Sequence, residues 1–302
     1  MRKGWVVALA AVLAGPLSAA PSWTAQRAAA PTMDGDLAEA CWQGAAAPPA
    51  LAPPITGFVL LGANQPATQQ TTARVAYDEQ ALYFAFDCQE DRPGDLVTAV
   101  SRRDGDVYTD DCVEVFLSPF ADPAVYYHFV VNAKGVLQDE KGQDRRWDSH
   151  AQAAARRSDR GYTVELAVPL RDLDLDATVT STWALSLCRE ERPHGEISSG
   201  APMKDGFHDP ARFGRLTGLD LDFAPFAGTT LASRAERSAE RADCLGYSIR
   251  DHRHLPLGQR LSARLKGVLA VFAETGSRLK SQASMAQLRD LQPTLAAADA
   301  EL

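Results

Sequence analysis

Short segments of alternating apolar and polar residues recur from Ala73 to Leu216, and this pattern is compatible with few folds. In the segment CVEVFLSP, for example, Val113 and Val115 face one side of a strand and Glu114 faces the other. Turn signals such as NAKG separate the segments, and no long helical pattern lies between them. The pattern therefore predicts a mainly β fold, an antiparallel β-sandwich of the jelly-roll-like type.

Two tryptophans are candidates for the interior of this sandwich. Trp42 ends the segment DLAEACW, which can form one short helical turn, and Trp183 shares a strand face with Leu185 and Leu187. The hydrophobic fraction of 45% is sufficient for a core in a chain of 302 residues. We expect both indole rings to be buried.

The alternation ends near Thr229, and apolar residues then recur at helical spacing. In the strongest segment these residues are Leu257, Leu261, Leu265, Val268 and Phe272. A weaker helical segment follows and is interrupted by Pro293. We expect a C-terminal α-helical extension with at least two amphipathic helices, which usually pack against a core. A surface for a protein partner is the alternative interpretation.

The N-terminus has the pattern of a secretory signal peptide. A basic start, MRK, precedes the apolar run WVVALAAVLAGPL, and small residues follow at which cleavage after Ala20 or Ala25 would fit. The run is shorter than the roughly 20 residues that a membrane-spanning helix needs. We expect a secreted or periplasmic protein with no membrane span after signal removal. The predicted division is signal peptide 1–25, sandwich 26–224 and helical extension 225–302.

Charge and cysteine content exclude some classes of partner and site. The formal net charge of −8 argues against nucleic acid, which would favour a basic face. No CxxC pair occurs, so the sequence predicts no zinc site. The five cysteines are scattered along the chain: Cys41, Cys88, Cys112, Cys188 and Cys244.

No recognisable catalytic motif is present. The sequence has no GxSxG, no HExxH and no glycine-rich phosphate loop, and its six histidines are scattered. The acids of DGDVYTDD could supply the two carboxylates of a glycosidase, but acids clustered in one loop more often form a solvated turn or a cation site. The sequence thus favours a protein without a catalytic site.

Calcium is the one cofactor that the acidic loop suggests. Asp104, Asp106 and Asp110 could supply the oxygen ligands that hard cations prefer. The loop is not an EF-hand, because Tyr108 stands where a third ligand would be needed and the EF-hand glycine is missing. We therefore keep these three acids as calcium candidates only.

Seven segments resemble, in the same order, those of the family 9 carbohydrate-binding modules and their relatives. They are MDGDLAEACW, ARVAYDEQALYFAFDCQED, DDCVEVFLSP, YYHFVVNAKG, GYTVELAVPLRDL, WALSLCRE and HDPARFGRL. The resemblance spans about residues 31–222 and includes nearly every predicted strand. It implies a β-sandwich that binds mono-, oligo- or polysaccharides without cleaving them, often as an accessory to an enzyme of polysaccharide breakdown.

The resemblance also implies binding residues. In characterised members two aromatic side chains clamp a sugar ring, one just before the DxVE strand and one just before DPxxFG. These positions correspond to Tyr108 and Phe207 here, although the best-known members have Trp at each. Aromatic faces meet sugar C–H groups, and carboxylates accept sugar hydroxyls.

Four polar residues complete the predicted ligand-binding set. The glutamate of the family's strand corresponds to Glu114 and the asparagine of its VN pair to Asn132, and we add Asp111 and Arg189. Val130 stands two residues before Asn132, where the best-known member has a binding arginine, so the chain departs from the family pattern at this position and the resemblance does not define the detailed ligand specificity.

Two alternatives belong to other functional classes. Related sandwich folds hold haem in periplasmic electron transfer, and His128 or Met203 could be axial ligands, although no CxxCH motif accompanies them. A surface adaptor that uses the helical extension to bind a protein partner is the other alternative.

Overall fold

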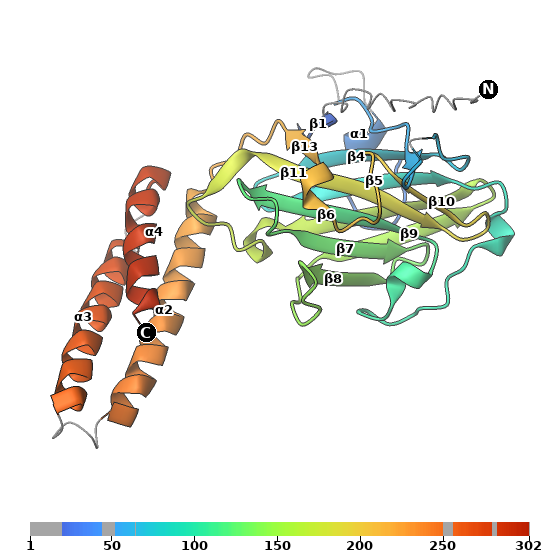
Figure 1. Ribbon diagram of the computed structural model, residues 1–302. Helices are drawn as coiled ribbons and strands as arrows, with labels where there is room; N and C mark the ends of the chain where they lie inside the picture. The colour runs from blue at the N-terminus through green and yellow to red at the C-terminus, as the bar shows by residue number, and fades with distance from the viewer. Residues whose placement is uncertain (1–19, 44–51, 64, 250–255, 280–282, 302) are drawn as a thin grey trace, which may run out of the picture.

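A computed structural model describes residues 20–43, 52–63, 65–249, 256–279 and 283–301. These residues form a β-sandwich and, at one end of it, a bundle of three helices that contains the C-terminus (Figure 1). Most of the predicted signal peptide, residues 1–19, lies outside the described residues.

The larger sheet has eight strands, most of which run antiparallel to their neighbours. In spatial order its main path is β1 (Ser22–Thr24), β13 (Gly214–Thr217), β11 (Val179–Glu191), β6 (Cys112–Phe120), β7 (Tyr127–Asn132) and β8 (Leu137–Lys141). Two short strands, β12 (Glu196–Ser199) and β3 (Val59–Leu60), extend the sheet beside β11.

The smaller sheet has five strands. Their order is β2 (Gln26–Arg27), β4 (Thr71–Tyr77), β5 (Ala81–Gln89), β10 (Gly161–Pro169) and β9 (Gln152–Ser158). The N-terminal strands β1 and β2 run parallel to β13 and β4, so each sheet is mixed at one edge. The predicted mainly β sandwich with a helical extension is confirmed, and these two parallel pairs are an unpredicted detail.

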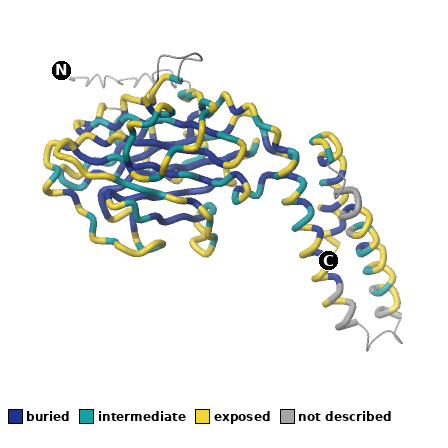
Figure 2. The backbone as a smooth tube through the Cα atoms, turned by 180° about the vertical axis from the view of Figure 1, so that it is seen from behind, coloured by how far each residue is buried: buried dark blue, intermediate teal, exposed yellow. Residues whose placement is uncertain are grey.

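The predicted alternation brings branched and aromatic side chains between the two sheets. Val113 and Val115 of β6 and Phe84 and Phe86 of β5 are at most 1% exposed. Burial of apolar surface, at about 25 cal/mol per Å², is the main favourable contribution to such a fold. The buried backbone is concentrated in the strands of the sandwich (Figure 2).

An aspartate closes one of the two tight turns that the sequence predicts, and a glycine permits the other. Asp78 Oδ1 accepts hydrogen bonds from the backbone N–H groups of Gln80 and Ala81, which closes the turn between β4 and β5. In the hairpin of β7 and β8, Gly135 has a φ of +79°, which glycine adopts without a steric cost.

Both predicted tryptophans are buried. Trp42 is 2% exposed and lies in α1 (Ala40–Gln43), where its indole N–H donates a 2.8 Å hydrogen bond to Glu165. Trp183 is fully buried and packs on Phe223, with 5.8 Å between ring centroids. The described residues between Ala73 and Leu216 contain no helix longer than three residues.

The helical extension consists of α2 (Ala224–Ile249), α3 (Pro256–Leu279) and α4 (Met285–Ala300). Its interior is made of alanine, leucine and valine side chains, among them Leu231, Val268 and Leu291. The helix α4 continues through Pro293 and begins with a capping box of Ser284 and Gln287. The side chains of Leu257, Leu261 and Phe272 lie outside the described part of the chain.

Hydrogen bonds connect the bundle to the sandwich at the loop between β10 and β11. Asp176 accepts from Arg234 of α2 at 3.1 Å and from Gln292 of α4 at 3.2 Å. Ala177 packs among the helices, and its backbone N–H donates to Gln292. The bundle and the sandwich are therefore in direct contact.

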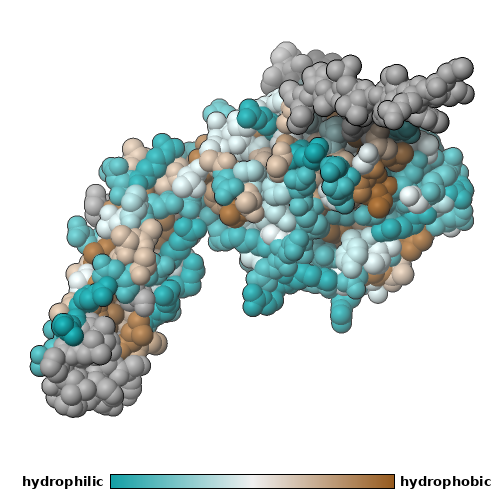
Figure 3. Space-filling view, viewed as in Figure 1, coloured by the Kyte–Doolittle hydropathy of each residue, from teal (hydrophilic) through white to brown (hydrophobic). Residues whose placement is uncertain are grey.

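The surface seen in Figure 3 is largely hydrophilic, with apolar side chains in separate groups on the helices and on the sandwich. Within the described ranges, no helix combines the length and the apolar character needed to cross a bilayer.

Candidate functional site

Three of the predicted binding residues line one hollow, although they come from distant segments. This small hollow has a volume of about 410 Å³ and lies on the outer face of the eight-stranded sheet. Tyr108, Glu114 and Phe207 belong to it. Its other lining residues are His128, Gln138, Glu140, Gln143, Arg145, Glu190 and His208.

Tyr108 stands at the rim of the small hollow. It lies in a 3₁₀ turn, Val107–Thr109, and the residue is 45% exposed. The preceding Val107 is fully buried, and its backbone N–H donates to Gln138 Oε1 at 3.1 Å. Arg192 donates a hydrogen bond to the carbonyl oxygen of Tyr108. The turn is thus held by its backbone, and the tyrosine ring is left for solvent or a ligand.

Phe207 lies on the other side of the hollow but is only 7% exposed. It packs in an apolar cluster with Phe116, Met203 and Phe213. Its ring centroid is 6.3 Å from that of Phe116, in an edge-to-face arrangement. The expected clamp of two open aromatic faces is therefore corrected: Tyr108 is open, whereas Phe207 is largely covered by its neighbours.

Three hydrogen-bonded side chains, in the order carboxylate, imidazole and carboxylate, form the floor of the hollow. His128 of β7 lies between Glu114 of β6 and Glu140 of β8. Its Nε2 is 2.7 Å from Glu114 Oε2, and its Nδ1 is 2.9 Å from Glu140 Oε1. Burial alone would lower the pKa of His128, but the hydrogen bonds to the two glutamates outweigh it and raise this pKa. His128 therefore bridges the two carboxylates, with one ring nitrogen within hydrogen-bond distance of each.

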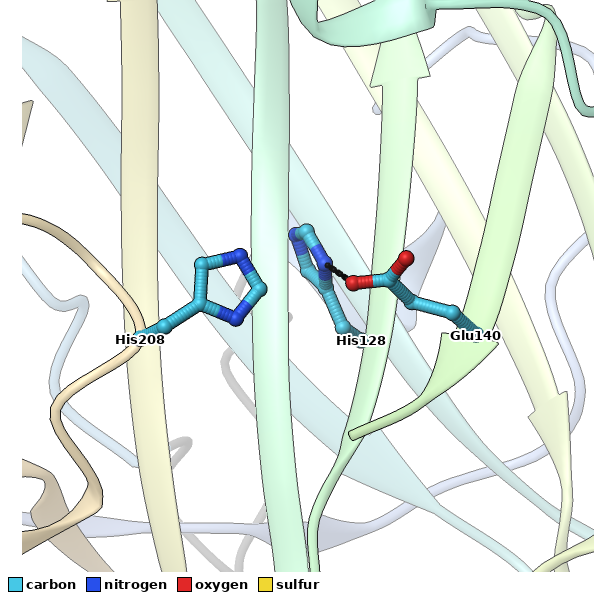
Figure 4. A group of neighbouring side chains, drawn as sticks. All are labelled: His128, Glu140 and His208. Atoms are coloured by element: carbon cyan, nitrogen blue, oxygen red, sulfur yellow. Dashed lines mark hydrogen bonds and ion pairs between the residues drawn. The ribbon is translucent and has the colours of Figure 1, made fainter. Parts of the chain in front are cut away.

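His208 lies above these three side chains, next to His128. The two imidazole centroids are 5.0 Å apart and their planes are nearly perpendicular, at 87° (Figure 4). His208 Nδ1 is 2.8 Å from the hydroxyl oxygen of Tyr126. Burial and the neighbouring charge of His128 lower the pKa of His208. The two histidines therefore differ in the direction in which their pKa values are shifted.

Glu190 and Arg145 bring further charge to the rim. Burial, together with the nearby Glu114, raises the pKa of Glu190 to about 7, and Arg192 opposes this. Arg145 pairs with Asp106 at 2.9 Å. The hollow thus combines one open aromatic ring with several hydrogen-bond donors and acceptors, which is the composition of a site for a small polar ligand.

Asp111, Asn132 and Arg189, which the sequence also predicts as ligand-binding residues, do not line this hollow. All three are fully buried and have other partners. Asp111 accepts from the backbone N–H groups of Val97 and Arg192. Their hydrogen bonds support the backbone, so a sugar hydroxyl finds no open position on them.

The side chains of Asn132 and Arg189 form hydrogen bonds with backbone groups at or near the ends of strands. The side-chain oxygen of Asn132 accepts from Lys134 and Val136 in the β7–β8 turn. Arg189 donates from Nη1 to the carbonyl oxygens of Gln69 and Gln89, at 3.1 and 2.8 Å. Both residues connect segments of the sandwich.

The three calcium candidates have separate partners. Asp106 pairs with Arg145, whereas Asp110 accepts from Ala99, Val100 and the side chain of Asn132. An oxygen of Asp104 lies within 4.8 Å of oxygens from Asp139 and Asp148 instead, and Arg103 pairs with Asp139 beside them. The three predicted acids do not converge on one point, so the predicted grouping is corrected.

The two candidates for a haem axial ligand are both buried. His128 is 3% exposed, and Met203 is 2% exposed within the cluster around Phe116. The structure gives this alternative no support.

Sequence reasoning did not identify Gln138, Glu140, Glu190 and His208 as neighbours of Glu114. A signal was available for three of them. Gln138, Glu140 and Glu190 occupy outward positions in strands whose alternate residues face the core, as Glu114 does. The cross-strand register that brings Glu140 opposite His128 could not be deduced from one sequence.

A second, larger hollow of about 820 Å³ lies on the five-stranded sheet. Thr72, Arg74, Asp87 and Thr163 from β4, β5 and β10 line it, together with parts of the N-terminal segment. None of the predicted binding residues is among its lining residues. The small hollow is therefore the candidate site.

Comparison with known proteins gives a consistent family assignment. The family model described as "Carbohydrate family 9 binding domain-like" matches residues 33–220. A crystal structure of a candidate carbohydrate-binding protein from Bacteroides uniformis is similar with a TM-score of 0.52 and 17% identity, and the match covers 66% of this chain and 99% of that chain. No curated protein matches the sequence.

Family 9 carbohydrate-binding modules from Caldicellulosiruptor kristjanssonii are also similar. Structures in complex with cellotriose and with glucose each have a TM-score of 0.47 and 14% identity. The matches cover 65% and 66% of this chain and 94% and 95% of those chains. At such identities a structural likeness bears on the fold alone.

Proposed function

Because the chain belongs to the carbohydrate family 9 binding domain-like family, we propose that it binds a saccharide in the small hollow and does not cleave it. The family match, residues 33–220, covers the sandwich except for β1 and β2 and does not include α2, α3 or α4. Binding is therefore assigned to the sandwich.

One observation carries the choice of the small hollow: the exposed ring of Tyr108 stands beside the buried chain of Glu114, His128 and Glu140. An aromatic ring can cover the C–H face of a sugar, and carboxylates accept hydrogen bonds from its hydroxyls. The volume of about 410 Å³ is within the range of small-molecule sites, roughly 300–1,000 Å³.

A glycan array probed with the chain lacking its signal peptide tests this proposal, with glucose and cello-oligosaccharides among the sugars. Isothermal titration with the best sugar then compares Tyr108→Ala with Arg74→Ala, which alters the large hollow on the other sheet. We expect binding to weaken only in the Tyr108 variant. Loss of binding in the Arg74 variant alone would move the site to the other sheet, and an array without any bound sugar would refute saccharide binding.

We also propose export, with cleavage of the signal peptide after Ala20. Of the two cleavage points that fit the sequence, cleavage after Ala25 would remove β1, which pairs with β13. It would also remove Trp23, whose ring packs so closely on Gly214 that a Cβ there would approach it to 2.6 Å. Mass spectrometry of protein recovered from the periplasm or medium should find Pro21 first, and a mature chain that starts at Gln26 would contradict this.

A link to polysaccharide breakdown remains part of the proposal. In this interpretation the sandwich holds the sugar, and the helical extension contacts a protein partner such as an associated enzyme. Co-purification of the full chain with a glycoside hydrolase, which a chain truncated after residue 223 fails to capture, would support the assignment. Equal capture by both chains would contradict a role of the helices.

A further inference from the structure

Three metal-ligating side chains converge on the floor of the small hollow. One ligand atom from each of His128, Glu140 and His208 lies within 4.8 Å of one from each of the others. They come from β7, β8 and the loop before β13, and Figure 4 shows the ring of His208 turned toward His128 and Glu140.

Each histidine has a separate partner on one ring nitrogen. Glu114 accepts from His128 Nε2–H at 2.7 Å, which leaves His128 Nδ1 facing Glu140. The hydroxyl oxygen of Tyr126 lies 2.8 Å from His208 Nδ1 and can accept a hydrogen bond from Nδ1–H, which leaves the lone pair on Nε2. Metal-bound histidines are held in this way, with the second ring nitrogen donating to a carboxylate or another oxygen.

We propose that His128, His208 and Glu140 form a binding site for a divalent transition-metal ion of the Zn²⁺ class, with its fourth position open to the small hollow. Two imidazole nitrogens and one carboxylate oxygen form a ligand set that Zn²⁺ accepts, and the open position would hold water or a ligand hydroxyl. The site contains no cysteine, which is why the cysteine pattern of the sequence did not predict it.

Binding of an ion through Nδ1 would need the neutral form of His128, because a ring nitrogen that carries a hydrogen cannot bind an ion. Glu114 then keeps its hydrogen bond from Nε2–H, and Glu140 exchanges its contact with Nδ1 for a bond to the ion.

Two other clusters of possible ligands are weaker candidates, because an arginine already neutralises each of them. Glu90, Glu191 and His194 form one cluster, and Arg189 Nη2 lies 3.6 Å from Glu90. In the other, Arg103 pairs with Asp139 at 2.8 Å. The cluster at His128 instead offers two imidazole nitrogens and one carboxylate oxygen.

Titration calorimetry with zinc chloride tests the proposal on the untagged chain after treatment with a chelator. We expect one ion per chain and weaker binding at acid pH, because protons compete with the ion for the ligands. His208→Ala should weaken binding by more than ~100-fold, and Tyr126→Phe, which removes only the outer oxygen, by ~10–100-fold. His208 is exposed, so its substitution should leave the fold intact, which circular dichroism can check.

Two control variants localise the ion. His194→Ala changes the competing cluster, and His150→Ala removes an exposed imidazole that pairs with Asp172. Neither should change zinc affinity, and cobalt should give tetrahedral absorption bands that only the variants around His128 lose. The proposal is overturned if the parent chain binds no zinc, if binding survives His208→Ala, or if His194→Ala abolishes it. The metal alone is the probe, so these outcomes are independent of sugar binding.

Discussion

Asp110 and Asp111 differ from Glu114 in the kind of group that donates hydrogen bonds to them. All three carboxylates are at most 3% exposed and lie close together on the chain. The two aspartates accept hydrogen bonds mainly from the backbone N–H groups of other segments. Glu114 accepts from an imidazole on the outer face of the sheet. The aspartates, Asn132 and Arg189 form what we call the scaffold network, and Glu114 belongs to the small hollow.

Burial therefore does not distinguish a scaffold residue from a site residue in this protein. The class of partner does, because a backbone group that loses its buried partner is destabilising wherever it lies. A side chain at the hollow can instead exchange its present contact for one with a ligand. The comparison predicts that substitutions in the scaffold network lower stability, whereas substitutions at the hollow change binding or pH dependence.

The largest effect is expected for Arg189→Met. Removing the guanidinium leaves the carbonyl oxygens of Gln69 and Gln89 without their charged donor and Glu90 without its cation. Breaking a buried pair in this way costs about 3–5 kcal/mol of unfolding free energy. Chemical denaturation should show this loss. Arg146→Met, whose side chain is 90% exposed, is the control and should change stability by less than ~0.5 kcal/mol.

The next effect concerns pH and Glu190. Because burial and Glu114 raise its pKa from 4.5 to about 7, the folded chain holds a proton there that the unfolded chain has released. Stability should therefore fall as pH rises from about 4.5 to 7, by an amount on the order of 3 kcal/mol at most. In a buffer that contains a chelator, the stability of Glu190→Gln should not show this part of the decline with pH. Identical pH profiles for both proteins would show that Glu190 ionises normally.

Asp110→Ala should have a smaller effect on stability, about 2–3 kcal/mol, because Ala99, Val100 and Asn132 lose a charged acceptor. Asp106→Ala is the matched control from the same loop. It pairs with Arg145 at a partly exposed position, so its loss should cost less than ~1 kcal/mol. Adding calcium should not change the difference. If both variants lost a calcium-dependent stabilisation of similar size, the loop would be a cation site and the comparison would fail.

The fold could be predicted from the sequence where alternation is strong. The strands β5, β6 and β11 have large apolar residues at every second position, and these residues form the core. The strand β9, QAAARRS, has no such pattern, because it is an edge strand whose residues are half-buried or exposed. The parallel strands β1 and β2 have three and two residues, too few for any period to be recognised.

The site was predicted only in part, for a related reason. The family resemblance located Tyr108, Glu114 and Phe207 along the chain, but contacts between strands depend on register, which one sequence does not contain. Arg189 could have been excluded. It continues the series Trp183, Leu185 and Leu187 at period two, so the same alternation that predicted the core directs it inward.

The smallest expected change in unfolding free energy among these site and scaffold variants is for Tyr108→Ala, and this variant tests the comparison most directly. Tyr108 lies two residues before Asp110, but its ring contributes little to the fold, because the residue is 45% exposed and its turn is held by Val107 and by a backbone contact with Arg192. Unfolding free energy should change by less than ~0.5 kcal/mol. Saccharide affinity should fall about tenfold, which corresponds to ~1.4 kcal/mol and lies within the range of stacking on an aromatic ring.

Tyr108→Phe separates the ring from its hydroxyl group. If the flat face of the ring is what contacts the sugar, the phenylalanine variant should bind within about twofold of the parent, a difference of ~0.4 kcal/mol. Calorimetry with the same sugar and denaturation of all three proteins give the two quantities needed. A tyrosine that stabilised the loop would show the opposite result: Tyr108→Ala would lose as much stability as Asp110→Ala, and affinity would follow stability. In that case the rim of the hollow would belong to the scaffold network, and the class of partner would no longer separate the two sets of residues.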